Sequence, residues 1–308
     1  MHTPSDHHDH AMHTGCDKHE HDMLHPQVPA VLPVVGRAKE SEHMASLFFP
    51  VPKSRRGQNR PVPSFDLSTY GAGQFIMVWL PGIDEKPYVV SYLGPNRFGI
   101  TILERGEFST ALCGLEEGSR VGFRGPYGRG FWDTDRDGGA VLIGGGCGMA
   151  TLGVLKHRLP DATLVQGAAT ERDVIFTTRF PNQIIYTEDG SMGCRGLPTD
   201  WLEDAVQDDA VDRVYVCGPE LMTVRVLDIC RRAGVPCQAS VERYMKCGIG
   251  VCGQCEIDGR LACKDGPVFS AEELGRLPSF GKITRDKSGA PIPVNPDSDE
   301  PAPGSSCK

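Results

Sequence analysis

The chain has 308 residues, of which 39% are hydrophobic and 23% are charged, and its formal net charge is −8. This length predicts two or three domains of an ordinary globular protein, and the acidic balance disfavours nucleic acid as a partner. The sequence has no apolar run long enough to cross a membrane and no apolar leader, so we expect a cytoplasmic protein whose thiols stay reduced.

Both ends of the chain are expected to stay unfolded. Residues 1–28 carry eight of the ten histidines without any apolar periodicity. Histidine together with Asp and Cys could bind nickel, copper or zinc, although a solvated tail is the simpler interpretation. Residues 286–308 are rich in Pro, Ser, Asp and Glu, a composition typical of disorder, and Cys307 is interpreted as a spare thiol.

Residues 29–134 are predicted to form an all-β domain. Short apolar runs recur through this stretch and are separated by Gly and Pro turn residues. The runs cover residues 31–35, 47–51, 74–80, 88–93, 99–103 and 120–124. Strands at this spacing favour a six-stranded antiparallel barrel, interrupted by one short helix at residues 108–113.

Residues 135–240 change to alternating strands and helices. The expected strands are residues 140–143, 163–168, 183–187 and 213–217, and the expected helices lie near residues 152–159, 198–206 and 220–233. Such alternation indicates a parallel α/β sheet with right-handed crossovers. This second domain is therefore predicted to be of the nucleotide-binding kind.

A glycine-rich turn follows the first of these strands. Gly144, Gly145, Gly146 and Gly148 lie between a buried strand and a helix, which is the context of a dinucleotide site. The turn lacks the GxGxxG pattern, and no acidic residue stands clearly about 20 residues further on to mark NAD over NADP. A tight strand-to-helix turn without a ligand is the structural alternative.

A second turn, Cys217-Gly218-Pro219, follows a later strand. Ligands of open α/β sheets bind beyond the carboxyl ends of the strands, so both turns are expected to face one cofactor. The Cys217 thiol could lie near the reacting carbon of a nicotinamide. A buried structural cysteine is the alternative.

Four cysteines crowd into residues 241–285. Cys247, Cys252, Cys255 and Cys263 follow the spacing C-x4-C-x2-C-x7-C, with glycines between them. The first three show the plant-type 2Fe-2S spacing, whereas a bacterial 4Fe-4S run spaces its first three cysteines by two. An Asp-Gly turn at residues 258–259 predicts a hairpin that returns Cys263 toward Cys255. A four-thiolate zinc site and a disulfide framework are the alternatives.

The barrel carries candidate flavin contacts. Lys86, Pro87, Tyr88 and Ser91 form one group, and Gly106, Ser109 and Thr110 form another at the start of the short helix. A cation, a flat aromatic ring, a hydroxyl and a helix N-terminus could hold a flavin ring and its pyrophosphate. From the residues alone, each piece could equally be ordinary barrel surface.

Taken together, these motifs resemble a known family. The matching segments are GQFIMVWLPG (73–82), RGPYGRGF (124–131), LIGGGCGMA (142–150), VCGPELM (216–222), ERYMKCGIGVCGQC (242–255) and CKDGPVF (263–269). In this order they resemble the ferredoxin–NADP reductase superfamily. Within it, the chain is similar to the electron-transfer subunits of NAD-dependent dihydroorotate dehydrogenase, over about residues 30–285.

The resemblance implies bound FAD, a 2Fe-2S cluster, a site for NAD(H) and a catalytic dehydrogenase partner in pyrimidine biosynthesis. It places Lys86, Pro87, Tyr88 and Ser91 on the flavin motif, and Gly106, Ser109 and Thr110 on the pyrophosphate motif. Lys86 replaces the usual Arg, and Val89 occupies the usual hydroxyl position. The cofactors carry the redox chemistry, so no side chain is assigned as acid or base, and orotate formation is expected on another polypeptide.

Two rival interpretations stay open at this point. The same electron-transfer module could serve another redox partner, of the sulfite reductase or sulfhydrogenase type. Alternatively, the chain could be a non-catalytic metal-binding or sensing protein, in which the His-rich segment and the cysteines hold metal.

Overall fold

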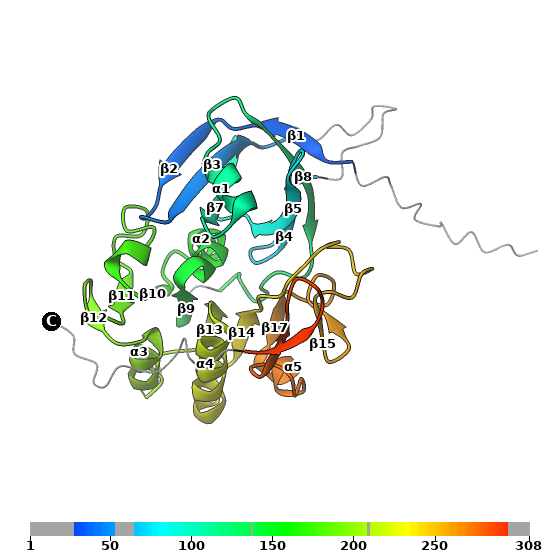
Figure 1. Cartoon of the computed structure of the whole chain (residues 1–308). Helices are drawn as coiled ribbons and strands as arrows, with labels where there is room; N and C mark the ends of the chain where they lie inside the picture. The colour runs from blue at the N-terminus through cyan, green and yellow to red at the C-terminus, as the bar shows by residue number, and fades with distance from the viewer. Residues whose placement is uncertain (1–27, 53–64, 137, 208–209, 295–308) are drawn as a thin grey trace, which may run out of the picture.

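The computed structural model describes residues 28–52, 65–136, 138–207 and 210–294. The expected tail at residues 1–28, apart from Val28, and the expected spare thiol Cys307 lie outside these residues. Figure 1 shows a β domain packed on an α/β domain, with the C-terminal segment, in orange and red, beside both. Within the described part of the chain, no helix has both the length and the apolar character needed to span a bilayer.

The first domain consists of two four-stranded antiparallel sheets. One has the order β1-β8-β4-β5 and the other β2-β3-β7-β6. The strands are β1 (Ala30–Pro33), β2 (Gly36–Lys39), β3 (Met44–Pro50), β4 (Phe75–Leu80), β5 (Asp84–Val89), β6 (Tyr92–Leu93), β7 (Arg97–Leu103) and β8 (Arg120–Tyr127), with helix α1 (Glu107–Cys113) after β7.

The expected count of six strands was wrong. Residues 36–39 form a strand of their own, and the apolar run at residues 88–93 is divided between β5 and β6. Val90 and Ser91 lie between these two strands and are both buried. The chain changes sheet at this point, because β5 pairs with β4 whereas β6 pairs with β7. A continuous apolar run cannot reveal such a change of sheet, because both strands bury apolar side chains.

Alternation along β4 gives its sheet two apolar faces. Ile76 and Val78 point into the main core, which the barrel shares with one face of the α/β sheet. Phe75 and Met77 point to the other side and pack against Met245 and the cysteine segment. The period-2 geometry of a strand therefore lets β4 contact two separate parts of the molecule.

The second domain is built on a seven-stranded sheet of order β12-β11-β10-β9-β13-β14-β17. Its strands are β9 (Ala140–Gly145), β10 (Thr163–Ala168), β11 (Ile184–Thr187), β12 (Cys194–Arg195), β13 (Arg213–Cys217), β14 (Cys237–Ser240) and β17 (Val268–Ser270). All neighbouring strands pair in parallel except β14 and β17. The predicted parallel α/β domain is confirmed.

The helices cover both faces of this sheet. Its helices are α2 (Met149–Arg158), α3 (Pro198–Ala205), α4 (Glu220–Ala233) and α5 (Ala271–Gly275), and the 3-10 turns are η1 (Gly146–Gly148) and η2 (Glu171–Asp173). Leu142 of β9 shares a core with Leu152 and Leu155 of α2, on the face toward the barrel. Val141 and Ile143 share a core with Leu202 of α3 and Val226 of α4 on the other face.

The cysteine segment is continuous with the α/β domain. It contains a hairpin of β15 (Glu256–Ile257) and β16 (Arg260–Leu261), which pair antiparallel. Asp258 and Gly259 both have positive φ, of 45° and 84°, as the predicted two-residue turn requires. Beyond this hairpin, β17 pairs with β14 and extends the sheet. Residues 241–285 therefore do not stand apart as a separate unit.

A further hairpin corrects the expected C-terminal tail. Strand β18 (Ile283–Arg285) pairs with β19 (Pro291–Pro293), although residues from 286 onward were expected to stay unfolded. The Asp286 carboxylate accepts hydrogen bonds from the amides of Ser288 (2.8 Å) and Ala290 (3.1 Å), which closes the turn. Arg285 pairs with Glu256 at 2.6 Å and ties the hairpin to the cysteine segment. A compositional argument cannot anticipate such contacts.

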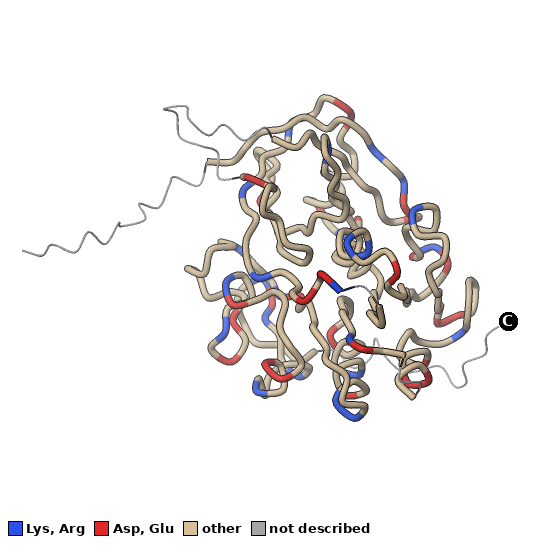
Figure 2. Tube along the Cα trace, turned by 180° about the vertical axis from the view of Figure 1, so that it is seen from behind, with Lys and Arg blue, Asp and Glu red and all other residues tan. Residues whose placement is uncertain are grey.

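Cationic side chains join the parts of the molecule. Arg179 donates from Nη1 to the Ser91 carbonyl (2.7 Å) and from Nη2 to the Gly153 carbonyl (3.1 Å), which links barrel and α2. Arg129 at the end of β8 pairs with Glu273 of α5 at 2.7 Å. Figure 2 shows basic and acidic residues interspersed over the trace of both domains.

Candidate functional site

Two turns meet at the carboxyl edge of the α/β sheet. Gly144 at the end of β9 is the register partner of Cys217 at the end of β13. A β-carbon on Gly218 would stand 2.9 Å from the Gly145 α-carbon, so the turns are in contact. Strands β10 and β13 flank β9 on opposite sides, which makes this edge the topological switch point where such sheets bind ligands. The expectation that the two turns come together is confirmed.

The turn after β9 adopts a backbone conformation that glycine favours. Gly146 has a φ of 50°, in the left-handed region that favours glycine. The turn passes through η1 directly into α2, whose first residue is Met149. An exposed backbone and a helix N-terminus at a switch point form a suitable floor for a dinucleotide.

Two thiols lie at these turns in different environments. Cys217 is buried, and its Sγ donates to Thr151 Oγ1 at 3.3 Å, so this thiol faces α2. Burial is also the largest cause that raises its pKa. Cys147 is only half-buried, and its Sγ lies 4.0 Å from Glu242 Oε1. Burial and the Glu242 charge raise the pKa of Cys147 to about 11. Cys147, rather than the predicted Cys217, is therefore the thiol on the open side.

Glu242 is a residue that sequence reasoning missed. It comes two positions after the end of β14, at the same carboxyl edge of the sheet. Its side chain is exposed to solvent, yet surrounding protein desolvates the carboxyl and raises its pKa, against the opposing charge of Arg105. Its position directly after a parallel strand was the available signal. A carboxylate with a perturbed pKa is a candidate functional residue.

The barrel presents one face of β5 toward this edge. Tyr88 stacks on Phe108 of α1 with ring centroids 6.2 Å apart, and the Cys147 charge contributes to the raised pKa of Tyr88, after burial. Lys86 Nζ pairs with Asp84 at 2.5 Å and lies over the Tyr244 ring. Pro87 belongs to the opposite face of the strand, because successive residues alternate.

Ser91 does not reach the surface of the barrel. Its side chain is 1% exposed, its Oγ accepts from Thr101 Oγ1 (2.7 Å), and it donates to the Gly99 carbonyl (3.3 Å). The hydroxyl is therefore engaged inside the barrel, and a flavin contact of Ser91 stays a prediction. Ser91 lies between β5 and β6, where the chain passes from one sheet to the other.

Of the three predicted residues at the start of α1, two are exposed and one is buried. Ser109 is buried, and its Oγ accepts from the amides of Arg105 (2.9 Å) and Gly106 (3.0 Å). It therefore shapes the turn from within. Gly106 and Thr110 are exposed and line an open hollow, together with Arg105. These two residues, with the Arg105 cation, are accessible to a ligand.

The four predicted cysteines converge in two pairs. Cys247 and Cys252 have neighbouring thiols, as do Cys255 and Cys263. The Cys263 amide donates to Cys255 Sγ at 3.4 Å, which confirms that the hairpin returns the fourth cysteine. Among the described residues, no three Cys, His, Asp or Glu side chains are arranged to hold one metal ion. The Cys247 charge also contributes to the raised pKa of Cys263, so the two pairs are neighbours.

Backbone amides surround the sulfurs. Cys247 Sγ accepts from the amides of Ile249 (3.5 Å), Val251 (3.4 Å) and Cys252 (3.5 Å), and Cys263 Sγ accepts from Gly250 (3.2 Å). Burial opposes ionisation of Cys247, but these amides outweigh it and hold the pKa at about 6. Amides aimed at thiolates stabilise negative charge, so the donor set fits an iron–sulfur cluster.

The comparisons with known proteins agree with this geometry. Residues 242–275 match the iron-sulfur cluster binding domain of dihydroorotate dehydrogenase B. The chain is 40% identical over 230 residues to a probable dihydroorotate dehydrogenase B (NAD(+)) electron transfer subunit of Methanocaldococcus jannaschii, which covers 71% of this chain and 87% of that protein. The subunit of the same name from Methanothermobacter thermautotrophicus is 38% identical over 278 residues, 86% of this chain and 98% of that protein.

This chain belongs to the family of dihydroorotate dehydrogenase B electron transfer subunits.

Solved structures place this family among ferredoxin reductase-like folds. An NADH-dependent reduced ferredoxin-NADP oxidoreductase superposes with a TM-score of 0.65 at 26% identity, covering 79% of this chain and 89% of that one. Phthalate dioxygenase reductase, at 18% identity and a TM-score of 0.50, shares the fold over 65% of this chain and 64% of that chain. Both agree with a two-domain reductase-like fold.

Proposed function

We propose that this protein is the electron-transfer subunit of an NAD-dependent dihydroorotate dehydrogenase. It would move electrons between NAD(H) and a catalytic partner subunit through FAD and a 2Fe-2S cluster. The observation that carries the proposal is the pairing of Cys247 with Cys252 and of Cys255 with Cys263, on a segment packed against the barrel. The names of the relatives supply the dihydroorotate partner.

The four cysteines would hold the cluster as thiolates. The low pKa of Cys247 favours its ionised form, whereas burial and the Cys255 thiol raise the pKa of Cys263 to about 12. Cationic iron would drive the ionisation of Cys263 on ligation. The amides of Ile249, Gly250 and Val251 would then donate to the ligating sulfurs.

The cleft residues would bind and orient the nucleotides. Gly144, Gly145, Gly146 and Gly148 would accept the pyrophosphate of NAD(H), and Cys217, Gly218 and Pro219 would form the wall of the same site. Tyr88 and Lys86 would border the flavin, Pro87 would stiffen the strand between them, and Gly106, Ser109 and Thr110 would shape the pocket for its pyrophosphate. The cofactors supply hydride and single-electron chemistry, while the protein fixes their positions and excludes solvent.

A carboxylate and a thiol lie beside the two turns. Glu242 and Cys147 lie 4.0 Å apart at the carboxyl edge of the sheet. The Arg105 charge on the barrel side lowers the pKa of both, and the Cys147 charge contributes to the raised pKa of Tyr88. We assign these residues to the zone in which nicotinamide and flavin would meet. No general acid or base is required of them.

The test uses protein purified without oxygen. We expect about two irons per chain, flavin absorbance, and reduction of an artificial dye by NADH. Cys252→Ser should abolish electron transfer to the partner subunit and leave dye reduction by NADH intact. A preparation that contains zinc and no iron would falsify the proposal, and so would a Cys252→Ser protein that still reduces the partner at the normal rate.

A second partner is favoured by one comparison. The NADH-dependent reduced ferredoxin-NADP oxidoreductase matches 79% of this chain at 26% sequence identity. This similarity extends to the sequence as well as the fold. The same module could therefore serve a different catalytic flavoprotein. Isolation of the native complex decides between the two partners. A dihydroorotate-oxidising subunit in the complex supports the first proposal, and another redox enzyme supports the second.

A further inference from the structure

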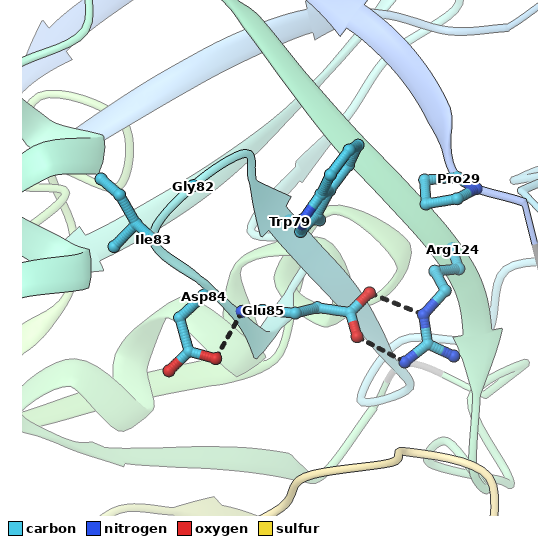
Figure 3. A pocket seen from close by; sticks show the side chains of 7 residues that line it. All are labelled: Pro29, Trp79, Gly82, Ile83, Asp84, Glu85 and Arg124. Carbon is cyan, nitrogen blue, oxygen red and sulfur yellow. Dashed lines mark hydrogen bonds and ion pairs between the residues drawn. The ribbon is translucent and has the colours of Figure 1, made fainter.

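A buried guanidinium connects the barrel to the cysteine segment. Arg124 on β8 has a side chain that is 9% exposed. Its Nε and Nη2 atoms donate to Glu85 Oε1 and Oε2 at 2.6 Å each, as Figure 3 shows. Nη2 also donates to the Cys247 carbonyl oxygen at 3.0 Å. A single side chain therefore holds a carboxylate of the barrel and the backbone of the first cysteine.

The strands determine this arrangement. Glu85 is the register partner of Trp79, and Arg124 is that of Met77, on the two strands that flank β4. Both side chains therefore project on the same face as Met77 and Trp79, which is the face that packs against the cysteine segment. Glu85 and Arg124 thus meet across the central strand, directly at the turn that begins with Cys247.

Burial of this pair has a cost that its geometry must offset. Two charges removed from water are stable only when they are paired and when their remaining hydrogen-bonding groups are satisfied. The fork of Arg124 satisfies both carboxylate oxygens, and its remaining contacts are the Cys247 carbonyl and the Tyr127 hydroxyl, at 3.4 Å. Removal of Glu85 leaves the buried Arg124 charge unpaired, and removal of Arg124 leaves the carboxylate of Glu85, which is 24% exposed, without its partner.

The Cys247 turn also makes an apolar contact with the barrel. Gly248 rests on Met77, since a β-carbon at Gly248 would stand 3.0 Å from Met77 Cγ. Ile249 and Val251 are exposed, at 38% and 78%. The hydrogen bond from Arg124 to the Cys247 carbonyl therefore holds this turn against β4.

We propose that Arg124, held by Glu85, positions the Cys247 turn and supplies a positive charge that favours the electron-loaded form of the cluster. This inference rests on the proposed function, because it takes the four cysteines as ligands. Loading adds one electron, and thus one negative charge, with no bond made or broken. A nearby cation stabilises that added charge, and a nearby anion opposes it.

The inference predicts opposite effects for the two partners. Arg124→Gln removes the cation and leaves Glu85 unpaired, so the reduction potential of the cluster should fall. Glu85→Gln removes the anion and keeps Arg124, so the potential should rise. Arg124→Lys keeps the charge without the fork, so its potential should lie between those of Arg124→Gln and the wild type.

Arg129 offers a matched control. It makes the same kind of bidentate pair with Glu273, at 3.0 and 2.7 Å, and its Nε donates to a backbone carbonyl, that of Val268, at 2.9 Å. It also joins the barrel to the C-terminal segment, but its carbonyl partner is not on a cysteine. Arg129→Gln should lower the stability of the protein and leave the cluster potential unchanged.

The experiment measures iron per chain and the midpoint potential of the full-length holoprotein, by titration with dithionite followed by electron paramagnetic resonance. Opposite shifts in Arg124→Gln and Glu85→Gln, with none in Arg129→Gln, support the inference. Unchanged potentials, or shifts of both variants in one direction, overturn it. If Arg124→Gln retains no iron, the Glu85→Gln shift alone decides. Wild-type protein without iron would instead reject the proposed function, a result distinct from all of these.

Discussion

A β-carbon on Gly148 would stand 2.3 Å from the carbonyl oxygen of Cys217. This is closer than any side chain can approach, so the turn after β9 can lie against the end of β13 only with glycine at this position. The contact sets how closely the two turns approach each other. It also makes Gly148 a point where stability and binding can both be tested.

Gly148→Ala should separate the two turns. The added methyl group must displace backbone rather than a flexible side chain, so we expect a loss of about 1–3 kcal/mol in the free energy of unfolding. Binding of NADH should weaken at the same time. Urea unfolding and NADH titration measure the two effects. Gly275→Ala, where no atom lies within 4 Å of the new methyl, is the control and should be neutral; equal behaviour of the two variants would contradict the prediction.

Arg179→Met should loosen the contact between the domains. The guanidinium donates to the carbonyls of Ser91 and Gly153, and its Nε lies 3.0 Å from His157 Nε2. Loss of these bonds leaves polar atoms unpaired at the interface, for a cost of about 1–3 kcal/mol. Thermal melting checks the effect. Arg232→Met, which removes only exposed ion pairs with Asp228 and Glu203, should change stability far less.

Glu242→Gln should change how stability depends on pH. Because the folded-state pKa of Glu242 is raised, its protonated form is favoured in the fold. That contribution is fully present below the unfolded pKa and is lost as pH rises through the folded pKa. The variant should therefore match the wild type at acid pH and exceed it in stability near neutral pH. Melting temperatures between pH 4 and pH 8 give the test, with Glu116→Gln at an exposed site as control; a gap that grows toward acid pH would oppose the assignment.

Met77→Ala should weaken the packing of the cysteine segment against β4. Met77 is fully buried, and it packs with Cys255 and Cys263 beneath Gly248. Truncation of a buried side chain costs about 2–5 kcal/mol, and here the resulting void lies under the ligands. We expect loss of iron on gel filtration, measured as iron per chain. Ile100→Ala removes a fully buried side chain of the main barrel core and should keep its iron; equal iron loss would argue against a local effect.

The local motifs were predictable because each depends on neighbouring residues. The Asp258-Gly259 turn, the return of Cys263 and the glycine turn after β9 are set by spacings of a few residues. Contacts between distant segments were not accessible in the same way. Arg124 and the Cys247 carbonyl are 123 positions apart, and Glu242 and Cys147 are 95 apart. No periodicity in the sequence encodes those pairs.

Ser91 shows a different limit of the sequence pattern. The apolar run around it indicated one strand, and in such a strand Ser91 would face away from Lys86 and Tyr88, because it lies an odd number of positions from each. The chain instead leaves one sheet after Val89 and enters the other at Tyr92. Where a strand breaks between sheets, alternation no longer predicts which side a residue faces.

Strand β5 is the partition between the two proposed redox centres. Glu85 and Val89 face the cysteine segment, while Tyr88 faces α1 and the cleft. Insertion or deletion of a single residue in this strand would exchange the two sets of side chains and present a charged pair to the flavin and a ring to the iron. The length of β5 is therefore a constraint on how this gene can vary, independent of which amino acids the strand contains.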